Sequence, residues 1–347
     1  MAGSQRTAGA APVPVVDIRS LFAPPTGERT AADAAILEAA RSVGFLIVTG
    51  LPGAVPLGPA ARRELLRIFG LAPDAIRSLW RRKFEPRNPN VYRGWFPLQP
   101  GNLTSKEGID LGADIAYGAS VVRADDPLQE RTPVPAESDL PGWRQAVAAY
   151  YTAMSDVSVT LMRSIARSLG LDERFFDCAF HHGLSTLRLL RYPVRSAAEL
   201  ATVNDPALWT GGLDGRYYVT GAAHTDSGFM TLLAQDGIPG LQARSRDGRW
   251  VDVPPLEGGI AVNFGQVLER WSDARIRATE HRVIGRGEER YSIPFFYEAR
   301  ADAEIRPLPM DDAASFEPFL FGDYLWARIT AFVEFRGMQA ERTPRRG

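Results

Sequence analysis

The chain has 347 residues, enough to bury a large core, and its composition is ordinary for a globular protein. The formal net charge of -1 gives no electrostatic basis for binding nucleic acid or an anionic membrane surface, and no apolar run is long enough to cross a bilayer. The single cysteine, Cys178, excludes an internal disulfide; we expect it to be buried, in a cytoplasmic protein. The oligomeric state is not readable from the sequence.

The first half of the chain predicts mainly helices. Residues 1–12 contain no apolar segment and are expected to form a flexible leader. Short buried strands are expected at 13–21 and 44–48, and apolar residues recur at helical spacing between them. Further helices are predicted at 60–69, 73–84 and 143–169. We therefore expect residues 13–170 to form a helical region that packs on the rest of the chain.

One stretch of this half predicts a long loop. Residues 86–116 are rich in proline, glycine and asparagine and also carry Tyr92-Arg93-Gly94-Trp95-Phe96 and Lys106. A loop of this length in a compact domain is usually functional. The alternative is a surface excursion with a few buried aromatic residues.

From residue 184 the pattern changes to short strands separated by turns. The expected strands span 184–192, 216–224, 228–235, 240–244, 250–253, 260–264, 279–284 and 291–298. Strands of this length, with turns such as Arg246-Asp247-Gly248, indicate an all-β barrel or jelly roll. A last helix is expected at 321–337, covering the barrel or its mouth. Residues 171–347 would then be the barrel core, in one structural unit with residues 13–170.

Three residues of the β region have the side chains of a metal site. His224 and Asp226 lie two apart on an extended segment, so their side chains share one face. Together with His281 they supply two imidazoles and one carboxylate, the facial triad that holds non-haem Fe(II) and leaves positions open for oxygen and substrate. Zinc would accept the same three ligands.

A second group of residues is suited to binding a carboxylate. Arg290 and Ser292 share one strand face and offer a guanidinium fork plus a hydroxyl. The glycine-bearing stretch 285–289 predicts a hairpin turn that would place His281 opposite Arg290 or Ser292. A guanidinium inside a barrel needs a counter-ion, either a protein carboxylate or the carboxylate of a ligand.

The segment from His224 to Phe296 resembles the core of the 2-oxoglutarate/Fe(II)-dependent oxygenases, in the branch that includes isopenicillin N synthase. The motifs that carry the resemblance occur in order at His224-Thr225-Asp226, Gly240-Leu241-Gln242, Asn263-Phe264-Gly265, Trp271-Ser272, His281-Arg282-Val283 and Arg290-Tyr291-Ser292-Ile293-Pro294-Phe295-Phe296. The resemblance implies a mainly β fold with flanking helices: a double-stranded β-helix (a jelly-roll or cupin-like barrel) with N-terminal α/β elements and a C-terminal helix. It also implies a dioxygenase that uses Fe(II), 2-oxoglutarate and molecular oxygen. Such an enzyme hydroxylates, desaturates or cyclises a small-molecule substrate at an unactivated C–H bond, and we expect a role in secondary metabolism.

The resemblance assigns roles to particular residues. It implies that His224, Asp226 and His281 hold the iron, and that Arg290 and Ser292 bind the distal carboxylate of 2-oxoglutarate with Tyr192 nearby. Many family members carry Asn-x-Tyr before a proline, whereas this chain has Leu190-Arg191-Tyr192-Pro193, and isopenicillin N synthase also has Arg-Tyr-Pro. One alternative is therefore an oxidase that grips its substrate with the same Arg and Ser and uses no 2-oxoglutarate. An alternative of another class is a non-catalytic barrel protein, although all the expected ligands are present.

Overall fold

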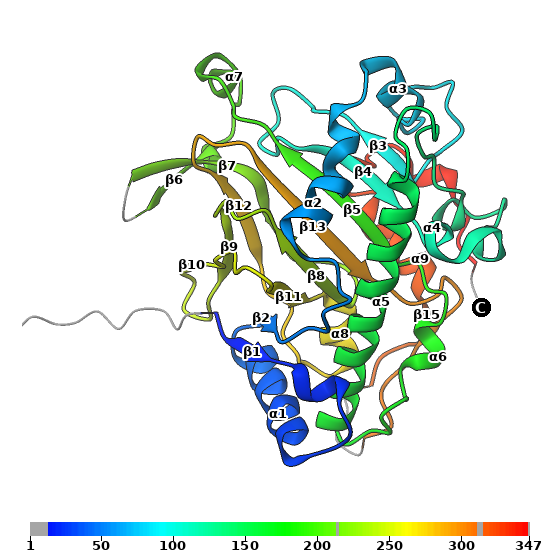
Figure 1. The fold of residues 1–347 in the computed structure, drawn as a ribbon, viewed down its shortest axis with the longest axis vertical. Helices are drawn as coiled ribbons and strands as arrows, with labels where there is room; N and C mark the ends of the chain where they lie inside the picture. Colours follow the sequence, from blue (N-terminus) through cyan, green and yellow to red (C-terminus); the bar gives the residue numbers. More distant parts are fainter. Residues whose placement is uncertain (1–12, 213–214, 311–314, 346–347) are drawn as a thin grey trace, which may run out of the picture.

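The computed structural model describes residues 13–212, 215–310 and 315–345, and its ribbon is shown in Figure 1. The expected flexible leader at residues 1–12 lies outside the described residues. Within the described ranges, no helix combines the length and apolarity needed to span a bilayer.

Two β-sheets form the centre of the molecule. The larger sheet has eight strands in the order β1-β2-β11-β8-β13-β5-β4-β3, and the smaller has five in the order β10-β9-β12-β7-β6. The strands of the larger sheet are β1 (Val15–Asp17), β2 (Phe45–Thr49), β3 (Gly94–Phe96), β4 (Glu107–Leu111), β5 (Thr186–Tyr192), β8 (Met230–Gln235), β11 (Ile260–Phe264) and β13 (Arg290–Tyr297). Those of the smaller are β6 (Trp209–Gly212), β7 (Gly215–His224), β9 (Leu241–Arg244), β10 (Trp250–Asp252) and β12 (His281–Gly285). A short pair, β14 (Glu304–Ile305) and β15 (Phe319–Leu320), lies outside both sheets.

The two sheets face each other across a shared apolar core. Side chains of both sheets pack there, including Phe45 and Leu190 from the larger sheet and Ala243 and Val283 from the smaller. Apart from the parallel pair β1–β2, the paired strands of the two sheets run antiparallel. Two curled antiparallel sheets closed face to face make a double-stranded β-helix. The expected jelly-roll fold is therefore confirmed.

Helices cover the outer face of the larger sheet. The longest, α5 (Trp143–Ser168), runs across this face with α1 (Gly27–Ser42) and α2 (Pro59–Leu66) beside it (Figure 1). The other α-helices are α3 (Pro73–Ser78), α4 (Asp114–Tyr117), α6 (Asp177–Phe180), α7 (Ala197–Ala201), α8 (Gln266–Trp271) and α9 (Phe321–Ile329). The apolar stripe of α5 is buried: Trp143, Val147, Tyr150, Met154, Val157, Leu161 and Ile165 are each at most 1% exposed. This stripe therefore packs in the core, as its helical spacing predicts.

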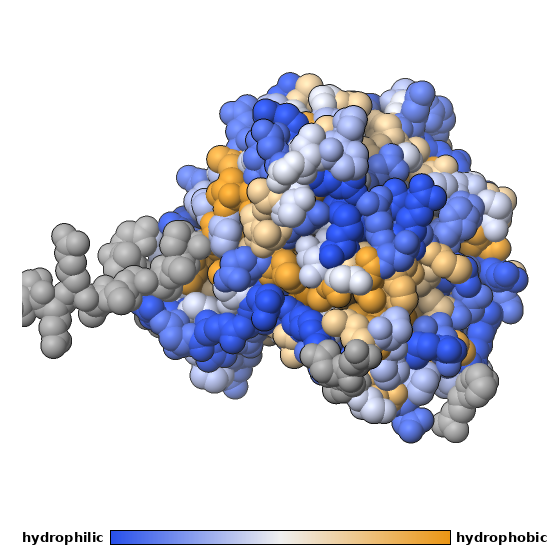
Figure 2. All heavy atoms as spheres, turned by 90° about the horizontal axis from the view of Figure 1, so that it is seen from below, coloured by the Kyte–Doolittle hydropathy of each residue, from blue (hydrophilic) through white to orange (hydrophobic). Residues whose placement is uncertain are grey.

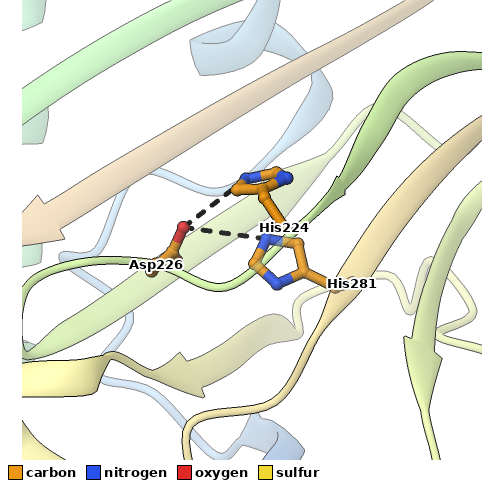
Figure 3. Close-up of side chains that lie close together, drawn as sticks. All are labelled: His224, Asp226 and His281. Carbon is orange, nitrogen blue, oxygen red and sulfur yellow. Dashed lines mark ion pairs between the residues drawn. The ribbon is translucent and has the colours of Figure 1, made fainter. Parts of the chain in front are cut away.

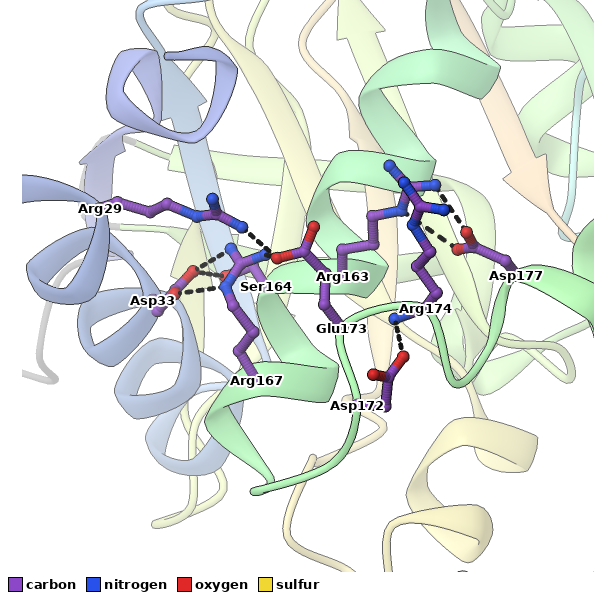
Figure 4. A network of polar contacts seen from close by, with 9 residues as sticks. All are labelled: Arg29, Asp33, Arg163, Ser164, Arg167, Asp172, Glu173, Arg174 and Asp177. Atoms are coloured by element: carbon purple, nitrogen blue, oxygen red, sulfur yellow. Dashed lines mark hydrogen bonds and ion pairs between the residues drawn. The ribbon is translucent and has the colours of Figure 1, made fainter. Parts of the chain in front are cut away.

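A polar network fixes α1 against α5. Asp33 of α1 accepts hydrogen bonds from Ser164 (2.6 Å) and from the guanidinium of Arg167 (2.7 and 2.8 Å), both on α5 (Figure 4). Glu173, just after α5, pairs with Arg29 of α1 and with Arg167. These charge-assisted bonds set the position of the N-terminal helix on the sheet-covering helix.

All eight strands expected from residue 184 onward are present, with ends shifted by at most two residues. The hairpin predicted between the strands of His281 and Arg290 is wrong. Strand β12 pairs with β7 and β9, whereas β13 pairs with β5 and β8, so the turn between them carries the chain from one sheet to the other. His281 therefore does not pair with Arg290 or Ser292.

The stretch expected to be a loop at 86–116 contains two strands. β3 and β4 pair with each other, and β4 pairs with β5, which extends the larger sheet. The helix predicted at 73–84 ends at Ser78 because the next residues join β3: the backbone N–H of Arg81 donates to the carbonyl of Trp95 (3.0 Å). Cys178, expected to be buried, is exposed.

The helix expected at 321–337 ends at Ile329. Beyond it, Lys83 Nζ donates to the carbonyl of Val333, and the side chain of Glu334 turns toward Lys106. These contacts hold the segment in turns in place of further helix. Its residues line a cavity, as described below.

The outer surface is of the mixed kind usual for folded proteins. On the face shown in Figure 2, hydrophilic residues dominate, with smaller apolar areas visible between them. Much of any folded protein's accessible surface is apolar, so these areas require no special explanation.

Candidate metal centre

The structure brings His224, Asp226 and His281 together at one end of the space between the sheets. Their ligand atoms all lie within 4.8 Å of one another. Asp226 Oδ1 is 3.7 Å from Nε2 of His224 and 3.7 Å from Nε2 of His281 (Figure 3). Among the described residues, this is the one cluster of histidine, cysteine and acidic side chains with the spacing of a metal site.

Sheet register explains the meeting of the two histidines. His224 is the last residue of β7 and His281 is the first of β12, and the two are direct partners in the antiparallel ladder. Directly opposed residues have Cβ atoms about 5 Å apart, so their imidazoles can reach one ion. Asp226 lies just beyond the end of β7, where the chain turns back toward β8.

Backbone carbonyls orient both imidazoles. His224 Nδ1 lies 2.8 Å from the carbonyl of Ala222, and His281 Nδ1 lies 3.1 Å from that of Thr279. A carbonyl can only accept, so each Nδ1 carries the proton and each Nε2 keeps its lone pair for a metal. The Nε2 atoms are the ones that face Asp226 Oδ1. The edge of the Phe45 ring, with its centroid 5.5 Å from that of His281, adds steric support.

Asp226 is held just as firmly. Its Oδ2 accepts hydrogen bonds from Thr231 Oγ1 (2.6 Å) and from Asn263 Nδ2 (2.7 Å), which leaves Oδ1 for the ion. Burial acts to raise the pKa of Asp226, but the imidazoles of His281 and His224 and these two hydrogen bonds outweigh burial and bring the pKa below its usual value. The carboxylate is therefore ionised and aimed, as a metal ligand must be.

His224 is kept neutral by its surroundings. Burial, followed by the neighbouring His281, lowers the pKa of His224 to about 4, although Asp226 acts in the opposite direction. A neutral imidazole is the form that binds a metal ion. The protein thus presents two neutral nitrogen donors and one anionic oxygen donor, the set that suits Fe(II) and that zinc would also accept.

Arg290 and Ser292 form a second group of buried polar atoms, on β13. Arg290 is 3% exposed, and its Nη2 donates to Gln235 Oε1 at 3.2 Å. Arg290 Nε and Nη1 and Ser292 Oγ have no hydrogen-bond partner among the described residues. Tyr192 is the direct partner of Arg290 in the ladder, with its ring centroid 5.2 Å from the guanidinium carbon. Three unpartnered polar atoms around a fixed guanidinium fit a ligand carboxylate.

Strand β8 relates this group to the candidate metal ligands. Thr231, which bonds Asp226, and Gln235, which bonds Arg290, lie four residues apart on β8 and share one face. Residues so placed are about 13 Å apart along the strand. The Arg290 side chain and a five-carbon dicarboxylate that chelates the ion can together cover this span.

A cavity of about 100 Å³ opens beside the ligands. His224 and Asp226 form part of its wall, and the C-terminal segment covers it through Phe332 and Phe335. The ring centroid of Phe332 lies 6.1 Å from that of His224. The volume corresponds to several water molecules, so a small ligand fits next to the ion.

Sequence reasoning missed the residues that support these groups. Thr231 and Gln235 alternate on one face of β8, a period-two signal that could have shown their common side. Asn263 stood in a motif that carried the family resemblance, but its bond to Asp226 was not foreseen. Arg188 and Lys106 also line the cavity; the sequence marks Lys106 only as part of the 86–116 stretch expected to be functional, and nothing in it marks Arg188.

Comparisons with known proteins point the same way. A family model described as the 2OG-Fe(II) oxygenase superfamily matches residues 189–299, a range that contains all the candidate ligand residues. The chain is 28% identical to isopenicillin N synthase of Streptomyces clavuligerus over 332 residues, which covers 94% of this chain and 97% of that protein. It is 31% identical to proline hydroxylase buaE of Petromyces alliaceus over 242 residues, or 66% of this chain and 70% of that protein.

A solved structure is similar over most of the fold. The full-length T7H of Neurospora crassa in complex with alpha-KG aligns with a TM-score of 0.76 at 25% sequence identity. The alignment covers 92% of this chain and 96% of that one.

Proposed function

Because the chain belongs to the 2OG-Fe(II) oxygenase superfamily, we propose that its His-Asp-His cluster holds a ferrous ion and that Arg290 and Ser292 bind 2-oxoglutarate. The protein is a 2-oxoglutarate/Fe(II)-dependent dioxygenase. One observation carries the proposed ligand roles. Arg290 Nε and Nη1 and Ser292 Oγ are buried and have no partner among the described residues, and they lie on the same barrel face as Thr231, which supports Asp226.

Iron held by His224, Asp226 and His281 and 2-oxoglutarate held by Arg290 and Ser292 would supply, with molecular oxygen, the oxidant for an unactivated C–H bond, with succinate and carbon dioxide as the products of 2-oxoglutarate. The protein's own groups position the iron and the co-substrate and exclude water. Thr231 and Asn263 occupy one oxygen of Asp226, so the other faces the ion. Arg290 fixes the far carboxylate of the co-substrate, with Tyr192 beside it. The C-terminal segment covers the cavity and keeps bulk water from the reacting carbon.

The isopenicillin N synthase-like alternative differs in what Arg290 and Ser292 bind. Leu190, which stands where many family members have asparagine, is the ladder partner of Ser292. An apolar residue there adds no hydrogen bond to a bound carboxylate, so Arg290 and Ser292 must hold that carboxylate without its help. The alternative predicts substrate turnover with oxygen and no 2-oxoglutarate.

The substrate is proposed to be a small molecule, and the pathway one of secondary metabolism. Support comes from the size of the cavity and from relatives named as a proline hydroxylase and isopenicillin N synthase. We also propose a cytoplasmic location, consistent with one unpaired cysteine. Residues 13–170 and 171–347 are proposed to act as one unit, since β2, β3 and β4 lie in the same sheet as β5 and β13.

Loading the purified protein under nitrogen tests this proposal. One Fe(II) per chain should bind, and addition of 2-oxoglutarate should then produce the visible charge-transfer absorption of the Fe(II)–2-oxoglutarate chelate. Asp302→Ala serves as a control and should behave like the unaltered protein, because Asp302 is exposed and bonds only Arg300 among the described residues. Normal loading of iron without any spectral response to 2-oxoglutarate would contradict the co-substrate assignment.

A further inference from the structure

The cavity beside the metal ligands has one strongly polar wall. Thr186 and Arg188 reach it from β5, and Lys106, just before β4, and Glu334 complete it. The rest of the lining includes six apolar residues, Phe229, Phe296, Leu325, Ile329, Phe332 and Phe335. A ligand in this space therefore meets both charged groups and aromatic and aliphatic surface.

Arg188 is held rigidly, with one nitrogen left over. Its Nε and Nη2 donate to the two oxygens of Asp110 at 2.5 and 2.8 Å. Its guanidinium carbon lies 5.2 Å from the ring centroids of both Phe96 and Phe296. No hydrogen bond joins Nη1 to any described residue, and the side chain keeps 15% of its surface exposed. A guanidinium fixed in this way is ready to bind an anion without losing further freedom.

Lys106 is similarly placed. Its Nζ lies 3.1 Å from Glu334 Oε1, with 15% of the lysine side chain exposed. Burial acts to raise the pKa of Glu334, but Lys106 and Arg188 outweigh it and lower that pKa to about 2. Glu334 is therefore ionised and lies close to both cations. Its carboxylate already occupies the place where a ligand anion could bind.

The charges of this wall do not balance. The ion pairs form two groups: Arg188 of the wall and the buried Arg81 share Asp110, and Lys106 pairs with Glu334, so three cations stand against two carboxylates. Glu298 also lines the cavity, but burial, and then the nearby Asp226, raise the pKa of its carboxyl well above the usual value, so it adds no negative charge. Arg81 is fully buried and does not line the cavity, so it adds charge beside Arg188 but no donor for a ligand in that space. A buried excess of positive charge is costly unless a ligand supplies the missing anion.

We propose that the substrate of this oxygenase carries a carboxylate that binds to Arg188 and Lys106, with its apolar body against the aromatic residues of the C-terminal segment. This inference rests on the proposed function, because it places the substrate beside the iron. The cavity is small, so the oxidised carbon lies only a few bonds from the carboxylate. The substrate class is thus a small apolar acid.

A matched pair of probes tests the charge preference. Protein loaded with Fe(II) and 2-oxoglutarate under nitrogen is titrated by calorimetry with 3-phenylpropionate and with 3-phenylpropionamide, which share size and shape. The acid should bind about ten- to a hundredfold more tightly than the amide. Equal affinities, or no detectable binding of the acid at millimolar concentration, would overturn the inference.

Three variants separate charge recognition from a structural role. Lys106→Met should remove most of the acid's advantage. Arg306→Met is the control, because Arg306 is an exposed cation that pairs with Glu304 and does not line the cavity, so the ratio of affinities should stay unchanged. Glu334→Gln should strengthen binding of the acid but not of the amide, since it removes the competing carboxylate. Weaker acid binding in that variant would show that the wall is structural only.

Failure of the proposed function and failure of the charge preference would show in different measurements. If the proposed function were wrong, the protein would not give the Fe(II)–2-oxoglutarate absorption at the loading step. If only the preference for an acid were wrong, the protein would load normally and then bind acid and amide alike.

Discussion

Replacing Arg290 by glutamine tests the co-substrate site most sharply. The guanidinium is 3% exposed and donates to Gln235, while two of its nitrogens have no partner among the described residues. A shorter neutral side chain cannot supply this charged fork. Arg290→Gln should therefore weaken 2-oxoglutarate binding and leave the iron ligands untouched.

The size of the effect follows from the hydrogen bonds to 2-oxoglutarate that the substitution removes. A hydrogen bond to a charged group contributes about 1.5–3 kcal/mol, and two nitrogens of Arg290 have no partner among the described residues. A loss of about 3 kcal/mol corresponds to about a hundredfold increase in the Kd for 2-oxoglutarate. Iron affinity should change little, because Arg290 contacts none of the three metal ligands.

The assay is an anaerobic titration of the iron-loaded protein with 2-oxoglutarate. Arg191→Gln is a suitable control: Arg191 lies on the neighbouring strand and pairs with Glu107 and Glu289, away from the free donors. An unchanged Kd for 2-oxoglutarate in Arg290→Gln would refute the reasoning. A defect confined to the affinity for the main substrate would favour the isopenicillin N synthase-like alternative.

Three further predictions concern the metal centre. Asp226→Ala should abolish iron binding and activity. The iron content of the purified variant measures this, and a content equal to that of the unaltered protein would contradict the prediction. Asn263→Ala should lower iron affinity about tenfold, because it removes the hydrogen bond from Asn263 to Asp226 Oδ2. Competition with a chelator measures the iron affinity, and an unchanged value would count against the support role. The pKa of His224 lies at about 4 in the folded chain, below its ordinary 6.5. Between pH 6.5 and pH 4, His224 therefore binds a proton in the unfolded chain but not in the folded, metal-free chain. Its stability should therefore be full above pH 6.5 and decrease toward pH 4 in denaturant titrations, less steeply in His224→Asn, and equal slopes would show that His224 is not the cause.

The strands were the part of the fold most readable from the sequence. Alternating apolar residues between turns located β5 and β7–β13, because half-buried strands leave a period-two pattern. The turn after β12 was misread. A short glycine-bearing turn looks the same whether it returns along its own sheet or crosses to the facing one, and only the pairing of β13 with β5 and β8 distinguishes them.

The candidate ligand residues could be picked out from the sequence because His224-Thr225-Asp226 and His281 occur within a dense series of family motifs; a His-x-Asp pair alone is a weak signal. Their supports could not, because Thr231 and Asn263 are common residues whose value lies in a contact with Asp226. The polar cavity wall was also hidden. Arg188 lies in a strand whose charged residues would ordinarily face solvent, and its burial depends on β4, a strand formed within a stretch that reads as loop.

Turnover tests the central claim most directly. The purified protein, supplied with Fe(II), oxygen, 2-oxoglutarate and a panel of small apolar acids, should consume oxygen and 2-oxoglutarate and release succinate, and Asp226→Ala should release none. Full oxidation of a substrate in rigorously 2-oxoglutarate-free protein, with no succinate formed, would contradict the account.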